Sequence, residues 1–152
     1  MAHAEENLVQ ITLSLNLPRD ESTVPVARHI VRASLQEIGV ERGCVSDIEI
    51  ALSEASTNVL KHSGPGDDYA VSCEMNDDTC IIRVVDTGHG FDHASLGFAD
   101  ADKSAEQGRG IQLMRALVDD VRFLSKPEEG TIVHLEKSLE FTEQSIVSRK
   151  IR

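Results

Sequence analysis

Two polar residues, Glu54 and Asn58, lie four positions apart in an otherwise apolar helical pattern, so their side chains project from one face of the predicted helix. A carboxylate can accept a proton from a hydroxyl group or from water. An amide oxygen one turn away can bind Mg²⁺ on a polyphosphate without adding negative charge. The pair therefore favours magnesium-nucleotide chemistry, although Glu and Asn are also common on the solvent face of helices.

A glycine-rich segment, D-T-G-H-G, begins where an apolar strand pattern ends at Asp86. A carboxylate at the end of a strand can accept a hydrogen bond from an exocyclic amine such as that of adenine. Gly88 and Gly90 would let the backbone approach a base closely. Taken alone, the segment is more typical of an ordinary acidic turn after a strand.

A second glycine-rich segment, G-R-G, stands immediately before an amphipathic helical pattern. The N–H groups of Gly108 and Gly110 at the start of that helix could meet phosphate oxygens, and Arg109 could add a charged donor. The alternative for G-R-G alone is a flexible linker. Thr131, at the start of the final strand, could reach a nucleotide base through water or could simply favour a strand. In combination, the order and spacing of these segments make an ATP site the leading interpretation.

The charge balance limits the kinds of ligand and partner. Asp and Glu outnumber Lys and Arg by 26 to 15, a net charge of -11, which repels nucleic-acid backbones. We therefore expect no direct nucleic-acid binding, basic protein partners, and a need for Mg²⁺ wherever a polyphosphate is held near carboxylates. The 3 cysteines form no C-x-x-C pair, and no apolar run approaches about 18 residues. These patterns favour reduced thiols, a cytoplasmic location and no membrane span.

Hydrophobic periodicity predicts a layered α/β domain, of the α+β kind, with a largely antiparallel sheet. Ser46 and Glu49 are typical of a capping box, so we expect the second helix to begin beside them. We expect the domain to cover 8–139 and residues 140–152 to form a solvated tail. The predicted strands are 9–17, 69–75, 79–85, 121–124 and 131–139, and the predicted helices are 23–39, 46–62 and 110–118.

The chain resembles the ATPase superfamily of gyrase, the ninety-kilodalton heat-shock chaperones, histidine kinases and mismatch-repair proteins. The resemblance is carried, in the superfamily's order, by E-A-S-T-N-V-L-K-H, D-T-G-H-G-F, G-R-G-I-Q-L-M and G-T-I-V. It runs from about residue 8 to residue 138, and within the superfamily the chain looks most like bacterial anti-sigma-factor serine kinases. The implied fold is the histidine kinase-like ATPase fold, a two-layer sandwich with a mostly antiparallel mixed sheet and helices on one face.

The resemblance implies roles for the residues in these motifs. Glu54 becomes the general base, Asn58 the Mg²⁺ ligand and Asp86 the adenine contact. The remaining positions bind the nucleotide too: Gly88 and Gly90 in the base pocket, Thr131 beside it, and Gly108, Arg109 and Gly110 in a lid over the phosphates.

The resemblance also implies a regulatory function. The protein would bind ATP and Mg²⁺, form a homodimer, sequester an alternative sigma factor and phosphorylate a serine on an anti-anti-sigma antagonist, a STAS-domain protein. Arg28, on the first helix, matches a partner-contacting arginine of that family, although it could equally be a solvated helix arginine.

Two alternatives remain open. The chain could be a partner-switching regulator that binds ATP with little or no kinase activity, because Asp100, Asp102 and Glu106 in the lid would weaken triphosphate binding. It could also be a fragment of a histidine kinase, but only some nine residues precede the first predicted strand, without a dimerising helical hairpin. We therefore expect a stand-alone regulator.

Overall fold

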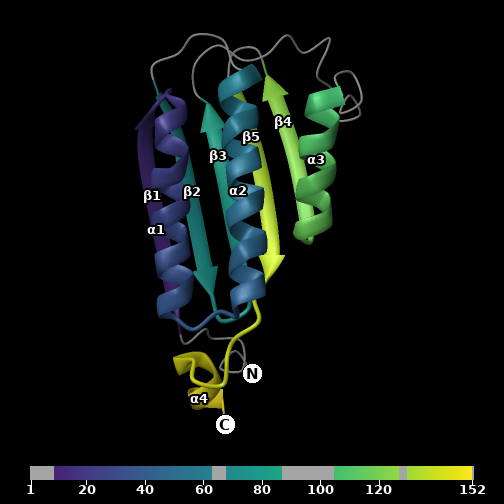
Figure 1. The fold of residues 1–152 in the computed structure, drawn as a ribbon. Coiled ribbons are helices and arrows are strands. Elements are labelled where there is room, and N and C mark those ends of the chain that lie inside the picture. The colour runs from purple at the N-terminus through teal and green to yellow at the C-terminus, as the bar shows by residue number, and fades with distance from the viewer. Residues whose placement is uncertain (1–8, 63–67, 87–104, 127–129, 152) are drawn as a thin grey trace.

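The computed structural model of the chain describes residues 9–62, 68–86, 105–126 and 130–151, and they form one antiparallel sheet with helices against it (Figure 1). The spatial order of the sheet is β1-β2-β3-β5-β4, and every neighbouring pair runs antiparallel. The strands are β1 Gln10–Pro18, β2 Asp68–Asn76, β3 Thr79–Asp86, β4 Asp120–Lys126 and β5 Gly130–Ser138. The helices are η2 Glu21–Thr23, α1 Val24–Glu37, α2 Arg42–His62, α3 Ala105–Leu117 and α4 Ile146–Ile151.

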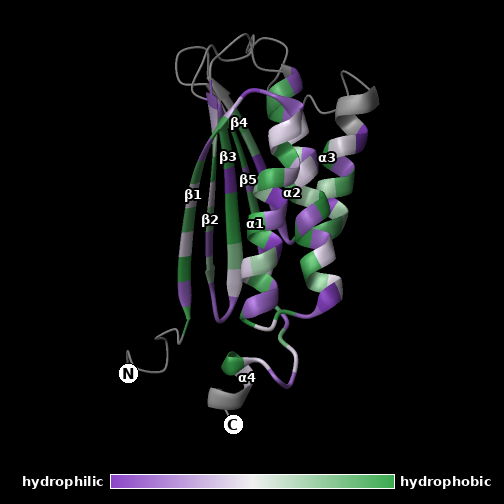
Figure 2. Ribbon diagram, turned by 60° about the vertical axis from the view of Figure 1, so that its left-hand side comes forward, coloured by the Kyte–Doolittle hydropathy of each residue, from purple (hydrophilic) through white to green (hydrophobic). Residues whose placement is uncertain are grey.

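The domain has two layers, and Figure 2 shows the three long helices on one side of the sheet. Alternate residues of each central strand point toward those helices and are buried, as Val71, Ile82, Val84 and Val133 are. Helix α2 packs over β3 and β5, between α1 and α3. The predicted two-layer fold is therefore confirmed, and all of its strand pairs are antiparallel. Within the described ranges, no helix is both long and apolar enough to cross a membrane.

The turn at each end of α1 follows from its sequence. Pro18 ends β1, and Thr23 occupies the N-cap of α1 with Pro25 in the first turn. The Thr23 hydroxyl bonds the carbonyl of Asp20 at 2.6 Å and the Tyr69 hydroxyl at 2.7 Å, so it ties the helix start to β2 rather than to a helix N–H. At the other end Gly39, with φ of 90°, ends the helix, as its position in the sequence predicts.

Two predicted helix starts are wrong. Helix α2 begins at Arg42, so Ser46 and Glu49 lie inside it and form no capping box. The earlier start follows from the buried residue Val40, which pairs with Phe141 and leads the chain directly into the helix. Helix α3 begins at Ala105, so the G-R-G segment lies within its first turns and does not precede it.

The prediction of a solvated tail is wrong for part of that segment. Ser145 and Val147 are each only 2% exposed. The Ser145 hydroxyl donates to the carbonyl of Ile38 at 2.6 Å, and the N–H of Thr142 donates to the carbonyl of Gly39 at 2.8 Å. The segment therefore closes the end of the domain where α1 turns into α2, the lower end in Figure 1. The domain boundary expected at residue 139 stays a prediction.

We predict that Gly39→Ala destabilises the protein by about 2 kcal/mol or more, because a side chain at positive φ is strained. The new Cβ would also lie 2.5 Å from the Cβ of Ser145, which is too close. Urea unfolding measures the loss. Gly43→Ala is the matched control, since a Cβ there meets nothing within 4 Å and Ala favours a helix by about 1 kcal/mol. Equal stability of Gly39→Ala and the wild type would contradict the close approach.

A second prediction concerns Tyr69, whose pKa is raised by burial. The stability linked to this group is fully present below its unfolded pKa of about 10 and is lost as the pH rises through the higher folded pKa. Tyr69→Phe should be less stable near neutral pH by about 1 kcal/mol, because the bond to Thr23 is gone. The difference from the wild type should then shrink as the pH rises above about 10. Thermal unfolding across this range measures it, and a constant difference would reject the assignment.

Candidate functional site

The predicted site residues that the structure describes gather at one end of the domain, the upper end in Figure 1. The end of β3, the start of β5, the last turns of α2 and the first turns of α3 all lie there. Asp86 and Thr131 are opposite each other in the register of β3 and β5, and both are fully buried. The inner face of the sheet, apolar along the middle of these strands, is therefore polar at this end.

Helix α2 holds Glu54 and Asn58 beside its buried stripe, as the sequence predicts. The stripe residues Leu52, Ala55 and Val59 are at most 1% exposed. Asn58 is 7% exposed and Glu54 is partly exposed, since each lies at the border of the stripe. The spacing of four residues places both side chains on the same side of the helix, one turn apart.

Asn58 carries a buried polar atom without a hydrogen-bond partner. Among the residues that the structure describes, its Oδ1 shares this property with the hydroxyl oxygens of Ser53 and Ser56 on the same helix. An orphaned buried acceptor costs about 1–3 kcal/mol, so such groups in native proteins normally have a function or a ligand. Mg²⁺ takes oxygen ligands and is usually held by one or two protein groups together with substrate phosphates. The donor set at Asn58 therefore fits a magnesium ion on a nucleotide.

Gly110 brings α3 against the carboxylate of Glu54. A Cβ built at Gly110 would lie 3.0 Å from the Oε1 of Glu54, so the absence of a side chain lets the two helices approach here. The first and third sequence motifs are thus neighbours in space. Arg109, the residue directly before Gly110 on the helix, is exposed.

The helical position of G-R-G corrects one expected role. The N–H groups without an intrahelical partner are those of the N-cap residue and of the first three helical residues, here 105–107. The N–H groups of Gly108 and Gly110 both lie beyond them. A phosphate-binding N–H is therefore not expected at either glycine, whereas the missing side chain of Gly110 provides space beside Glu54.

Asp86 has a partner that sequence reasoning missed. Its Oδ1 lies 2.8 Å from the Nη1 of Arg19, and the two side chains are 0% and 9% exposed. The Nη2 of Arg19 also donates to the carbonyl of Leu60 at 3.4 Å. The only local signal is a basic residue directly after the Pro18 that ends β1, and this gives no hint of a contact with β3.

Arg28 lies beside a groove between α1 and α2. Its Nε is 3.9 Å from the Oε2 of Glu49, and the Nη1 of Arg32 is 3.4 Å from the same oxygen. The groove has a volume of about 340 Å³ and extends from these arginines to Glu54. A partner segment in this groove would reach the predicted general base.

The other predicted site positions, Gly88 and Gly90, lie outside the described residues, as do the lid residues Asp100 and Asp102. The structure therefore gives no position for the base pocket that the two glycines are expected to form. Lys61, the neighbour of the predicted site on α2, is exposed.

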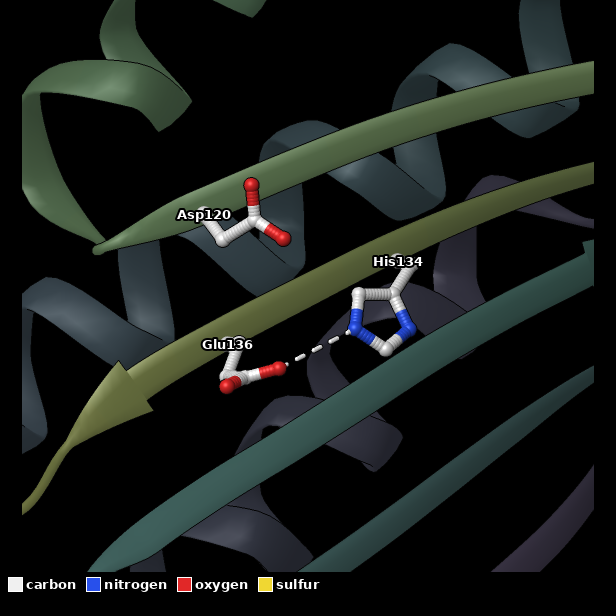
Figure 3. A group of neighbouring side chains, drawn as sticks. All are labelled: Asp120, His134 and Glu136. Carbon is white, nitrogen blue, oxygen red and sulfur yellow. Dashed lines mark hydrogen bonds and ion pairs between the residues drawn. The ribbon is translucent and has the colours of Figure 1, made fainter.

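A second polar cluster lies on the opposite face of the sheet and does not resemble a catalytic site (Figure 3). It consists of Asp120, His134 and Glu136, whose ligand atoms lie within 4.8 Å of one another. The Nε of Arg83 donates to the Nδ1 of His134 at 3.2 Å, and His134 Nε2 lies 3.4 Å from Glu136. Arg122 pairs with Asp120 at 2.9 Å. Because Arg122 pairs with Asp120, and His134 lies between Arg83 and Glu136, the cluster is a polar network of the outer face.

Comparison with known proteins identifies the class of protein that this fold and site define. Residues 17–137 match the family model of the histidine kinase-like ATPase domain. This match covers the sheet from the end of β1 to β5, together with α1, α2 and α3.

The relatives narrow the class. Serine-protein kinase RsbW of Halalkalibacterium halodurans is 30% identical over 138 residues, which are 85% of this chain and 84% of that protein. Serine-protein kinase RsbW of Listeria monocytogenes is 29% identical over 136 residues, 82% of this chain and 85% of that protein. The chain therefore belongs to the histidine kinase-like ATPase family, in its group of RsbW serine-protein kinases.

A solved structure supports the fold. The chain matches the RsbU and RsbW domains of Rv1364c from Mycobacterium tuberculosis with a TM-score of 0.65 and 22% identity. The match covers 85% of this chain and 32% of that longer chain.

The contact between Gly110 and Glu54 generates a prediction. In Gly110→Ala, the new methyl group pushes on Glu54 Oε1, which must shift by a few tenths of an ångström. We expect ATP turnover to fall about tenfold or more, since small displacements of reacting groups are costly, while the helix becomes no less stable. Steady-state turnover and thermal unfolding measure the two effects. Gly43→Ala, the same substitution in open space, should keep the wild-type rate, and an unchanged rate in Gly110→Ala would contradict the role of this contact.

Proposed function

We propose that the protein is an anti-sigma factor with ATP-dependent serine kinase activity. It binds ATP with Mg²⁺, sequesters an alternative sigma factor of RNA polymerase, and phosphorylates a serine on an anti-anti-sigma antagonist of the STAS-domain kind. It acts as a homodimer. The observation that carries the proposal is the buried, unpartnered amide oxygen of Asn58 one turn from the carboxylate of Glu54, in a chain of the RsbW group.

In the proposed mechanism Asn58 would hold the magnesium ion through Oδ1. Glu54 would take the proton of the serine hydroxyl as the serine oxygen bonds to the γ-phosphorus and ADP leaves. A bound Mg²⁺ would neutralise charge on the β- and γ-phosphates. Glu54 suits the role of base because its side chain is partly exposed, at the end of the groove between α1 and α2. Asn58 suits the role of ligand because a neutral amide adds no charge to an acidic protein.

The nucleotide base and the phosphates are assigned to different parts of the site. Asp86 accepts a hydrogen bond from the adenine amine, and Thr131, opposite it in the sheet, reaches the base through water. Gly88 and Gly90 complete the base pocket in this proposal. The phosphates would lie at the first turn of α3, whose leading N–H groups have no partner within the helix, with Gly108 beside them and Arg109 supplying charge.

Partner binding is assigned to the groove between α1 and α2. Arg28 is partly exposed there, with its side chain 34% accessible, and faces Glu49 at a distance too long for a strong bond. A partner carboxylate could therefore compete for this arginine. The groove also leads to Glu54, so a bound antagonist would place its serine near the proposed base.

Phosphate transfer to an antagonist tests the proposal. With Mg-ATP and a candidate STAS-domain antagonist, Glu54→Gln should lower the transfer rate about 10²- to 10⁴-fold and leave ATP affinity within about threefold of wild type. Asn58→Ala should instead raise the Mg²⁺ concentration needed for half-maximal rate. Glu74→Gln, a matched change of an exposed glutamate on the outer sheet face, should have no effect.

The outcomes separate the possible functions. Binding of ATP and of the antagonist without transferred phosphate would reject the kinase and leave a sequestering regulator that uses ATP as a conformational ligand. Wild-type transfer rates in Glu54→Gln would reject Glu54 as the base.

A further inference from the structure

We infer that Arg19 is a positioning residue for purine recognition, which holds the carboxylate of Asp86 so that the site selects an adenine over a 6-oxo purine. The inference rests on the proposed function, because it assigns Asp86 to the adenine amine. Arg19 belongs to no sequence motif of the nucleotide site and lies in the link between β1 and η2.

The burial of the pair gives the first argument. A carboxylate that is 0% exposed needs a charged or hydrogen-bonding partner, because burial of an unpaired charge is strongly unfavourable. Arg19 supplies a charge 2.8 Å away and is itself only 9% exposed. Its guanidinium is charged at every physiological pH and presents donors in a fixed plane, so it can fix the orientation of the carboxylate.

The second contact of Arg19 fixes the guanidinium itself. Leu60 lies near the end of α2, where carbonyl groups lack intrahelical partners and the helix dipole is negative. The guanidinium therefore lies between a helix end and a carboxylate. Since Asn58 is two residues before Leu60, Arg19 connects the helix that holds the proposed Mg²⁺ ligand to the strand that holds the proposed adenine contact.

The chemistry of a carboxylate gives the selectivity. An ionised carboxylate only accepts hydrogen bonds, so it can pair with the 6-amino group of adenine but faces a second acceptor in a 6-oxo purine. The discrimination depends on the carboxylate being fixed and charged. If Arg19 is removed, the carboxylate of Asp86 loses the contact that holds its orientation, and the distinction between the two purines should weaken.

Calorimetric titration of the full chain with Mg-ATP and with Mg-ITP tests this inference. ITP carries a 6-oxo group in place of the amine, and the phosphates are the same. Arg19→Met keeps the apolar stem of the side chain and removes its charge. The affinity for ATP should therefore fall about tenfold or more, as for the loss of a charged hydrogen bond. The affinity for ITP should change less than about threefold. Arg19→Lys retains the charge but not the planar donors of the guanidinium, so it should lose part of the preference for ATP, less than Arg19→Met loses, with ITP affinity unchanged. Arg122→Met, at an arginine that is 73% exposed on the outer sheet face, is the control and should change neither affinity.

Each outcome decides the inference. An equal loss of ATP and ITP affinity in both Arg19→Met and Arg19→Lys would show that Arg19 has a purely structural role and would overturn the inference. An unchanged preference for ATP over ITP in Arg19→Met would also overturn it. If Arg19→Met does not fold, Arg19→Lys still decides the question. A weaker preference of Arg19→Lys for ATP, with ITP binding intact, supports positioning by the guanidinium. Parallel losses of ATP and ITP affinity reject the inference. A wild type that binds neither nucleotide would reject the proposed function and the inference with it. A wild type that prefers ATP, with Arg19 variants that keep the preference, would reject the inference alone.

Discussion

The packing of α2 over the centre of the sheet is the constraint on which the rest of the structure depends. Its apolar stripe is buried against β3 and β5, which fixes the rotation of the helix about its axis. Once that rotation is fixed, Glu54 and Asn58 must lie at the border of the stripe, above the polar end of the sheet. Hydrophobic burial along the whole helix therefore positions the candidate site. The polar contacts of its residues fix only the final orientation of the side chains.

The polar end of the domain shows how a small protein holds charge inside a core. Asp86 and Thr131 replace apolar residues in the last inward-facing row of their strands. A buried polar group is tolerated only if it has charged or hydrogen-bonding partners. Arg19, in the segment that follows β1, supplies a charged partner for Asp86. The amide oxygen of Asn58 is also buried, with no hydrogen-bond partner among the described residues, and it lies one turn from Glu54.

Regular elements with a strong period could be predicted from the sequence, and contacts between distant segments could not. Hydrophobic periodicity predicted all five described strands, each within two residues of its observed bounds. The start of α3 was missed because its first turn has no apolar stripe, and the start of α2 because Val40 and Phe141 pair across about a hundred residues. Glu54 and Asn58 belong to a periodic motif, so their shared side of one helix could be predicted. Arg19 pairs with Asp86 on another strand, and no local pattern indicates such a contact.

The C-terminal segment divides the tasks of the molecule between its two ends. Ser145 and Val147 close the core around Gly39, at the end opposite to Asp86 and Thr131 (Figure 1). Changes there alter the balance between folded and unfolded chains without touching the residues of the candidate nucleotide site. In a cell, destabilising substitutions in these last residues would therefore lower the steady-state level of the protein, because proteases degrade its unfolded form. The molecules that remain folded would retain their chemistry.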